Sequence, residues 1–338
     1  MKRFSLVLFG LLLALQNFSQ TSNPDQYKYI FTVAKDGSGD YTYIQDAIDA
    51  MRVYPLRRIT LYIKNGVYNE KIVIPTDNTD ITFIGENVDK TVINFNDYSG
   101  RGKLNTFTSY TAKVSGNRFI AENITFLNSA GPVGQALALY VDADKAVFKN
   151  CRFLGNQDTI FCGGEHARQL FLDCYIEGTT DFIFGPATAV FQNCTVRGKT
   201  NSFITAANTP QGKKFGFVFL DCRIVVDSSV GKIYLGRPWR AYARTTFIRC
   251  ALPKQIAPEG WNNWGNPENE RTAYYAEYKN TGEGANTRSR AVWSKQLSEK
   301  DAKEYAIENI FLSENQSSQD SAWWKNIQLI PFEWPIKK

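Results

Sequence analysis

A repeat of five cysteine-centred segments constrains the fold of this 338-residue chain more than any other feature. Each segment reads apolar, apolar, variable, usually Asn or Asp, Cys, variable, apolar. The five are VFKNCRF (147–153), LFLDCYI (170–176), VFQNCTV (190–196), VFLDCRI (218–224) and TFIRCAL (246–252). FIAENITF (119–126) fits the same frame with Asn123 in the Cys place, and successive spacings are 28, 23, 20, 28 and 28 residues. Repeats of this length indicate a solenoid.

The local pattern selects the kind of solenoid. The units are short runs with period-2 alternation, separated by Gly, Asn and Asp turns, which is typical of strands. Leucine-rich repeats need a regular Leu ladder with an Asn column, and helical repeats need a long 3.6-residue periodicity; the sequence has neither. We therefore expect an all-β fold, a right-handed parallel β-helix whose coils stack in register, built as one domain over residues 21–338.

Both ends of the stack are expected to carry helical caps, because an open solenoid end invites edge-to-edge growth. TYIQDAIDAMRV (42–53) predicts an amphipathic helix with a capping box of Thr42 and Gln45. Residues 298–310 predict a second helix that starts at Ser298 and Asp301. The tail after it holds Trp323, Trp324 and Trp334, which we expect to pack back on the stack.

Residues 1–20 have the pattern of a secretory signal peptide: Lys2 and Arg3 precede an apolar run from Phe4 to Leu15, and polar residues follow. The run is too short to span a bilayer comfortably, and a buried N-terminal helix is the alternative. We expect a secreted or periplasmic protein, without a membrane anchor and monomeric. The net charge of +6 is mild and no long basic run exists, so nucleic-acid binding is not favoured.

Export permits disulfides among the six cysteines. Neighbouring coils of a β-helix lie about 4.8 Å apart, so members of the Cys column could bridge. The shortest repeat makes Cys174–Cys194 the favoured pair, and a column of small buried thiols is the alternative. No C-x-x-C pair suggests zinc, and the single histidine, His166, disfavours a multi-histidine metal site.

Two aspartates stand at equal positions in adjacent repeats. Asp158 and Asp181 each lie seven residues after the cysteine of their coil and are flanked by apolar and aromatic residues. Equal offsets in stacked coils place the carboxylates side by side, where one is pushed to keep a proton while the other stays charged. Such a pair supplies a general acid/base and a nucleophile without histidine, whereas a lone Asp would more often be a turn residue.

Three further features could complete this site. Arg237, held in the stiff segment YLGRPWR (234–240), could form a bidentate bridge to one carboxylate. Trp239 beside it could stack on a sugar ring, or belong to the core. Gln135 and Gln157 carry amide donors suited to a developing oxyanion, although their offsets alone do not place them on one face.

At these residues the sequence resembles the pectin methylesterases (pectinesterases), from about Val33 to Trp293. The matching motifs occur in the family's order: DGSGDYTYIQDAI (36–48), GVYNE (66–70), QALAL (135–139), GNQDTI (155–160), DFIFG (181–185) and LGRPW (235–239). The resemblance implies a right-handed parallel β-helix that removes methyl esters from the galacturonate units of pectin.

Residue by residue, the resemblance implies that Asp181 is the nucleophile, Asp158 the general acid/base, and Arg237 the partner of the nucleophile. Gln135 and Gln157 match the oxyanion donors. The positions that match the family's sugar cleft are Trp239, Phe184, Thr108, Ser109 and Phe161, the last of which replaces a tyrosine. No metal or organic cofactor is implied. The loop GGEHAR (163–168), with His166, departs from the family pattern, and its role stays open.

Three other functions fit a β-helix with this pattern. A polysaccharide lyase or glycosidase on the same polymer would cleave the chain rather than release methanol. A non-catalytic carbohydrate-binding solenoid would not depend on Asp181. A thioesterase on the same fold would differ only in substrate.

Overall fold

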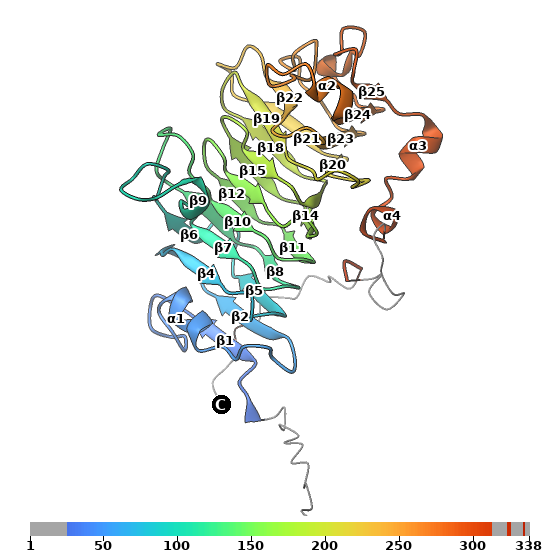
Figure 1. Ribbon diagram of the computed structural model, residues 1–338. Coiled ribbons are helices and arrows are strands. Elements are labelled where there is room, and N and C mark those ends of the chain that lie inside the picture. The colour runs from blue at the N-terminus through green and yellow to red at the C-terminus, as the bar shows by residue number, and fades with distance from the viewer. Residues whose placement is uncertain (1–25, 313–322, 326–333, 335–338) are drawn as a thin grey trace, which may run out of the picture.

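In the computed structural model, described for residues 26–312, 323–325 and 334, the chain winds into a stack of coils with three parallel sheets (Figure 1). The largest sheet has eleven strands, in the order β1 (Ile30–Val33), β2 (Ile59–Ile63), β5 (Ile81–Gly85), β8 (Ile120–Glu122), β11 (Ala146–Lys149), β14 (Arg168–Leu172), β17 (Thr188–Gln192), β20 (Phe217–Leu220), β23 (Arg244–Ile248), β24 (Tyr274–Tyr278) and β25 (Lys295–Gln296).

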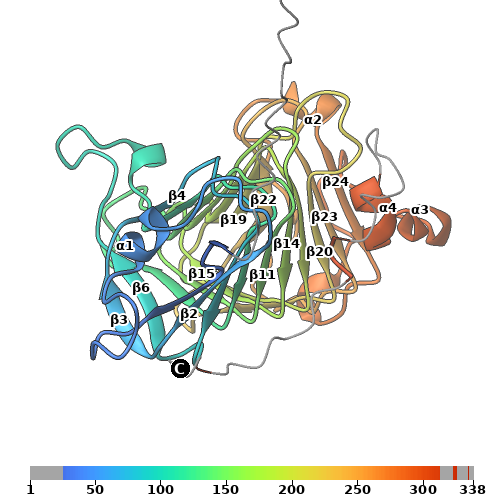
Figure 2. The same ribbon diagram turned by 90° about the horizontal axis from the view of Figure 1, so that it is seen from below.

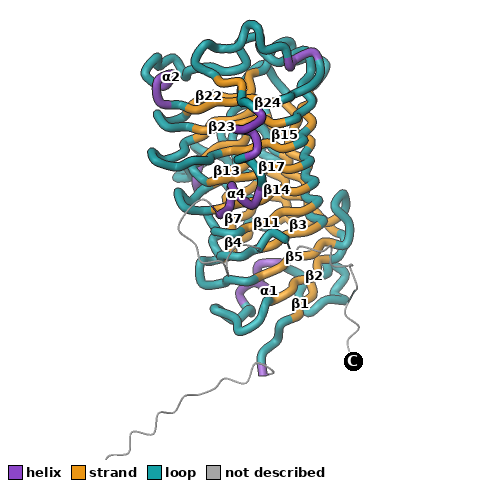
Figure 3. Tube along the Cα trace, turned by 90° about the vertical axis from the view of Figure 1, so that its right-hand side faces the viewer, coloured by secondary structure: helices purple, strands orange, loops and turns teal. Residues whose placement is uncertain are grey.

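The other two sheets have seven strands each. We call the first the groove sheet; it runs β4 (Ile72–Ile74), β7 (Ala112–Val114), β10 (Leu139–Val141), β13 (Ile160–Cys162), β16 (Ile183–Gly185), β19 (Phe203–Ala207) and β22 (Tyr234–Pro238). The third runs β3 (Gly66–Asn69), β6 (Thr91–Phe95), β9 (Thr125–Asn128), β12 (Arg152–Leu154), β15 (Tyr175–Gly178), β18 (Thr195–Gly198) and β21 (Arg223–Val226). The predicted parallel β-helix is confirmed, and its stacked strands are plain in the side view of Figure 3.

The repeat frame gives each coil its core. The phenylalanine three residues before the cysteine points inward, and successive rings stack with centroids 5.0 Å apart for Phe148–Phe171, 4.7 Å for Phe171–Phe191 and 4.6 Å for Phe191–Phe219. These side chains are fully buried. Register is therefore fixed from inside the stack, because a slip by one residue would turn the whole column outward.

The residue before each of the five repeat cysteines, usually Asn or Asp, has a backbone reason. This position adopts the left-handed conformation in all five repeats, with φ of +47° at Asn150, +55° at Asp173 and +54° at Asn193. In the segment 119–126 the left-handed residue is Asn123 itself, and the strand register aligns it with Asn150, so the prediction that Asn123 takes the Cys place is wrong by one residue. Asn and Asp tolerate this region better than other residues with a side chain. The Asn193 amide donates to Asp173 at 2.5 Å, so neighbouring turns are also tied to each other.

The structure contradicts the predicted Cys174–Cys194 disulfide: all six cysteines are free and buried. Each thiol of the column is directed at backbone carbonyls instead. Cys194 Sγ lies 3.4 Å from the Phe171 oxygen of the preceding coil, and Cys222 Sγ lies 3.2 Å from the Phe191 oxygen. The column of buried thiols, which the sequence left as the alternative, is what forms.

The N-terminal cap is confirmed, but its capping residue is not the predicted one. Helix α1 (Ile44–Asp49) lies at the near end of the stack in Figure 2, where it contacts β1 and β4, and it buries Ile44. No side chain at the N-cap position accepts a hydrogen bond, so the capping box of Thr42 and Gln45 does not form. The Glu70 carboxylate replaces it and accepts from the backbone N–H groups of Ile44 at 2.8 Å and Gln45 at 3.0 Å.

The second helical region lies elsewhere than expected. It divides into α3 (Glu299–Lys303), which begins at the predicted Ser298 and Asp301, and α4 (Ile307–Leu312). Ser298 and Asp301 form a capping box. Instead of closing the C-terminal end, α4 lies along the outer face of the eleven-stranded sheet (Figure 2), where Phe311 packs with Trp324 and apolar side chains of β11, β14 and β17. A short helix, α2 (Asn269–Thr272), precedes β24.

Trp323 and Trp324 do pack back against the stack as predicted, and the Lys64 ammonium lies 4.5 Å from the Trp334 ring centroid. No helix in the described part of the chain has the length and apolar character needed to cross a membrane. The predicted signal peptide, residues 1–20, lies outside the described residues.

Candidate active site

The two aspartates lie on adjacent coils at the start of neighbouring strands of the groove sheet. Ile160 of β13 pairs with Ile183 of β16, so Asp158 and Asp181, each two residues earlier, occupy equivalent places. Both have left-handed backbones, with φ of +62° and +50°, and each donates its N–H to the next coil. Both residues are buried, at 8% and 6% exposure. The sequence prediction that stacking brings them to one face agrees with this arrangement.

Arg237 makes a bidentate ion pair with Asp181. Its Nε lies 3.0 Å from Asp181 Oδ1 and its Nη2 lies 2.6 Å from Oδ2. The guanidinium is sandwiched between two aromatic rings, 3.9 Å from the Phe203 centroid and 3.7 Å from that of Trp264. Stacking on both faces and the fork of hydrogen bonds fix the Asp181 carboxylate in one orientation.

Burial and charge separate the two carboxyl groups. Burial, with the nearby Asp181 charge, raises the pKa of Asp158 from 3.8 to about 8, and Arg237 opposes that rise only in part. Burial also raises the pKa of Asp181, but here the direct hydrogen bonds and the charge of Arg237 hold the rise back. The two environments therefore differ: burial favours the protonated form of Asp158, whereas Arg237 favours the charged form of Asp181.

The two glutamines also come together. Gln135 and Gln157 form an isolated parallel bridge, and the Ala136 N–H donates to the Gln157 carbonyl at 3.1 Å. Both side chains line the same cavity as the aspartates. Within the described chain neither side-chain amide has a hydrogen-bond partner, so their N–H groups are available to a bound molecule. The strand register thus places Gln135 and Gln157 on the same face as the two aspartates, which their sequence offsets alone did not establish.

The cavity around these groups has a volume of about 260 Å³. Trp239 and Phe184 line it, as predicted. Sequence reasoning missed the other residues of the wall, which are Thr106, Phe107, Ala206 and Trp264. The sequence contains one weak indication of Trp264, which is a tryptophan within the Asn- and Gly-rich turn NNWGN (262–266). A larger cavity of about 600 Å³ lies under α3 and α4, far in the fold from the aspartate pair.

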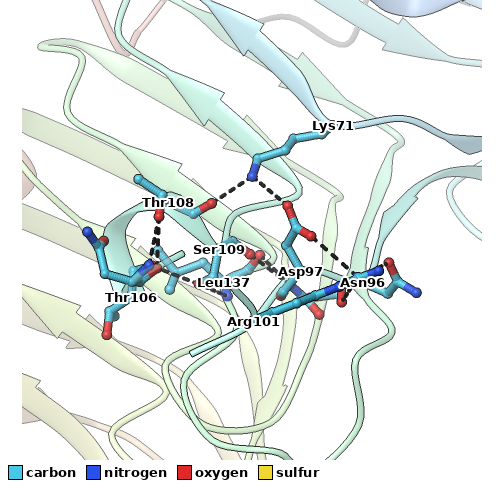
Figure 4. Close-up of polar contacts among 10 residues, drawn as sticks. Lys71, Asn96, Asp97, Arg101, Thr106, Thr108, Ser109 and Leu137 are labelled. Carbon is cyan, nitrogen blue, oxygen red and sulfur yellow. Dashed lines mark hydrogen bonds and ion pairs between the residues drawn. The ribbon is translucent and has the colours of Figure 1, made fainter. Parts of the chain in front are cut away.

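Thr108 and Ser109 are not part of the cavity wall. They follow Thr106 and Phe107 on the loop that forms part of this wall, and Figure 4 shows the polar contacts of Thr106, Thr108 and Ser109. The Thr108 carbonyl accepts a hydrogen bond from the Lys71 ammonium at 2.6 Å, and Lys71 also pairs with Asp97 at 2.7 Å. Ser109 is fully buried, and its hydroxyl donates to the Thr106 carbonyl at 2.7 Å. Thr108 is exposed on this loop, and Ser109 is buried beneath it.

The remaining predicted residue, Phe161, lies next to the cavity and packs against Phe184 and Phe107, with centroids 5.0 Å and 5.1 Å apart. His166 lies on the exposed loop between β13 and β14 and its Nδ1 is 3.2 Å from the Lys213 Nζ. It is not among the residues that line the cavity. In the described ranges no three His, Cys, Asp or Glu side chains gather in a way that could hold a metal ion.

Comparison with known proteins gives a consistent result. The Pectinesterase family model matches residues 30–315. Pectinesterase 31 of Arabidopsis thaliana is 38% identical over 302 residues, which cover 86% of this chain and 93% of that protein. Several other Arabidopsis relatives are longer, and the chain spans about half of their length, 52% for the probable pectinesterase/pectinesterase inhibitor 64.

Solved structures agree with the sequences. The pectin methylesterase from carrot superposes with a TM-score of 0.82 at 32% identity, covering 90% of this chain and 98% of its own. A pectin methylesterase in complex with a hexasaccharide superposes with a TM-score of 0.73 at 28% identity, covering 86% and 99%. The fold, the ordered motifs and these matches together show that the chain is an enzyme of the pectinesterase family.

Proposed function

We propose that this enzyme removes methyl esters from galacturonate units of pectin outside the cell, with Asp181 as nucleophile and Asp158 as general acid/base. The observation that carries the assignment is the pairing of Asp181 with Arg237 beside a carboxyl group that keeps its proton. The hexasaccharide bound by a solved relative supports a polysaccharide as substrate.

In the first half of the reaction, an Asp181 oxygen attacks the carbonyl carbon of the methyl ester. Negative charge develops on the carbonyl oxygen, where the amide N–H groups of Gln135 and Gln157 can donate to it. As the C–O bond to the methoxy group breaks, Asp158 gives its proton to the leaving oxygen and methanol departs. The product is an acyl-enzyme, a mixed anhydride on Asp181.

In the second half, Asp158 is a carboxylate and acts as base toward water. The hydroxide formed in this way attacks the sugar carbonyl of the anhydride and the bond to Asp181 breaks, which leaves Asp158 protonated, Asp181 as a free carboxylate and the product as galacturonic acid. The acid then ionises to galacturonate and releases one proton to solvent, so atoms and charge balance over the cycle. Arg237 stabilises Asp181 as the leaving group and returns it to the attacking orientation.

The experiment is methanol release from highly methylated pectin by the intact chain and by Asp181→Asn. The chain offers a matched control, because Asp221 also has a left-handed backbone, φ +55°, and a bidentate arginine partner, Arg249, but lies on the surface. We expect Asp181→Asn to lose activity by several orders of magnitude and Asp221→Asn to keep it. Equal rates for the intact chain and Asp181→Asn would refute the assignment of the nucleophile.

A further inference from the structure

The strand register of the groove sheet aligns one row of side chains on its outer face. The row runs through Val73, Lys113, Tyr140, Phe161, Phe184, Ala206 and Arg237, one residue from each coil. The residues before them in the strands, such as Ala112 and Leu139, are fully buried in the core. The row therefore faces outward and crosses the active site at its Arg237 end.

Aromatic rings connect this row into a continuous strip along the stack. Centroid distances are 6.1 Å for Tyr110–Tyr140, 4.9 Å for Tyr140–Phe161, 5.0 Å for Phe161–Phe184 and 5.9 Å for Phe184–Trp239. Apolar ring faces of sugars bind well on such rings. A polysaccharide held at the catalytic cavity is thus expected to extend along the strip toward Tyr140.

The positive charges along the row differ in whether a carboxylate forms an ion pair with them. The charge of Arg237 is matched by Asp181, and that of Lys71 beside the strip is matched by Asp97. Lys113 has no carboxylate within ion-pair distance in the described chain. It is half-buried, and its ammonium lies 4.7 Å from the Tyr140 ring centroid. One unmatched cation therefore stands at the far end of the strip from Arg237.

We propose that Lys113 binds the free carboxylate of a galacturonate unit that has already lost its methyl ester. This proposal rests on the proposed function, since that carboxylate is the product of the reaction. Two strand steps separate Lys113 from Phe161 and three separate it from Phe184, which corresponds to about 10 to 15 Å, or two to three sugar units from the reacting ester. The enzyme would then prefer esters that lie near a de-esterified unit.

The charge of the Lys113 ammonium explains why it would prefer a free carboxylate to a methyl ester. An ammonium on a half-buried aromatic surface forms a charge-assisted hydrogen bond with a carboxylate. A methyl ester at the same place carries no charge and offers a weaker acceptor, so it leaves the lysine without an ionic partner. Lys113 would act on the choice of substrate and on retention of the product, and takes no part in bond breaking.

The test compares two hexagalacturonates, one methylated on every unit and one methylated on a single inner unit. Lys113→Met should lower kcat/KM about tenfold for the singly methylated oligomer and change it less than twofold for the fully methylated one. Lys113→Arg should restore the preference. Lys35→Met is the matched control, because Lys35 also lies over a tyrosine ring, 5.6 Å from the Tyr68 centroid, at the N-terminal end of the stack.

A binding measurement separates this inference from the proposed function. Unmethylated hexagalacturonate should quench tryptophan fluorescence of the intact chain and bind about tenfold more weakly to Lys113→Met. Unchanged affinity, or an equal loss of activity on both oligomers, would overturn the role of Lys113 even if methanol release is normal. Failure of the intact chain to release methanol from either oligomer would instead overturn the proposed function.

Discussion

Replacing Asp158 with asparagine should stabilise the protein at high pH, and the gain should grow as the pH rises. The folded chain raises the pKa of this buried carboxyl from 3.8 to about 8, chiefly through burial. Between these values the folded protein holds a proton that the unfolded chain has lost, so the stability of the unaltered protein falls as the pH increases. Asparagine resembles the protonated carboxyl and does not titrate.

The size of the effect follows from the same values. The difference between 3.8 and about 8 corresponds to at most about 6 kcal/mol above pH 8, because each pH unit between the two values adds about 1.4 kcal/mol. For a protein of this size 1 kcal/mol changes the Tm by about 2 °C. We expect Asp158→Asn to match the unaltered protein near pH 4 and to exceed its Tm by up to about 10 °C at pH 9.

Calorimetric or fluorescence melting at pH 4, 6, 7.5 and 9 measures this difference. The exposed Asp221 provides the control, because its asparagine variant removes a carboxylate from the same left-handed backbone position. Asp221→Asn should not gain stability with rising pH. A constant Tm difference between Asp158→Asn and the unaltered protein across this range would show that the carboxyl titrates normally, and would refute the protonated Asp158 on which the mechanism depends.

Three further predictions follow from the structure. The kcat/KM of methanol release should fall tenfold per pH unit above about pH 8, as Asp158 loses its proton; a profile flat to pH 10 would contradict this. All six cysteines should react with a thiol reagent in denaturant without prior reduction, whereas four reactive thiols would indicate one disulfide. Glu70→Gln should lower the Tm by about 2 to 4 °C through the weakened cap of α1, with Thr42→Ala as a control that changes little.

Much of the fold could be predicted from the sequence because the repeat frame combines two independent signals. The phenylalanine and the cysteine mark inward positions, and the Asn or Asp between them marks a left-handed turn. Contacts between segments far apart in the chain leave no comparable pattern in the sequence. The Glu70 cap of α1 and the place of α4 on the eleven-stranded sheet depend on tertiary packing that no local pattern contains.

The aspartate pair at the centre of the site could also be predicted from the repeat. Asp158 and Asp181 occupy equal offsets, and parallel stacking converts equal offsets into adjacency. The positions of loop residues do not follow from equal offsets in this way. Thr106 and Phe107 lie in the cavity wall on a loop held by Lys71, which contacts Asp97 and the Thr108 carbonyl, and no local sequence pattern contains these contacts.

The left-handed backbone at Asp158 and Asp181 has an evolutionary consequence. At these two positions the turn and the chemistry favour nearly the same side chain, because Asn fits the backbone as well as Asp does. A single-nucleotide exchange between Asp and Asn codons at position 181 can therefore remove the proposed nucleophile without disturbing the coil. The scaffold would then keep its groove and its stability after losing the proposed chemistry.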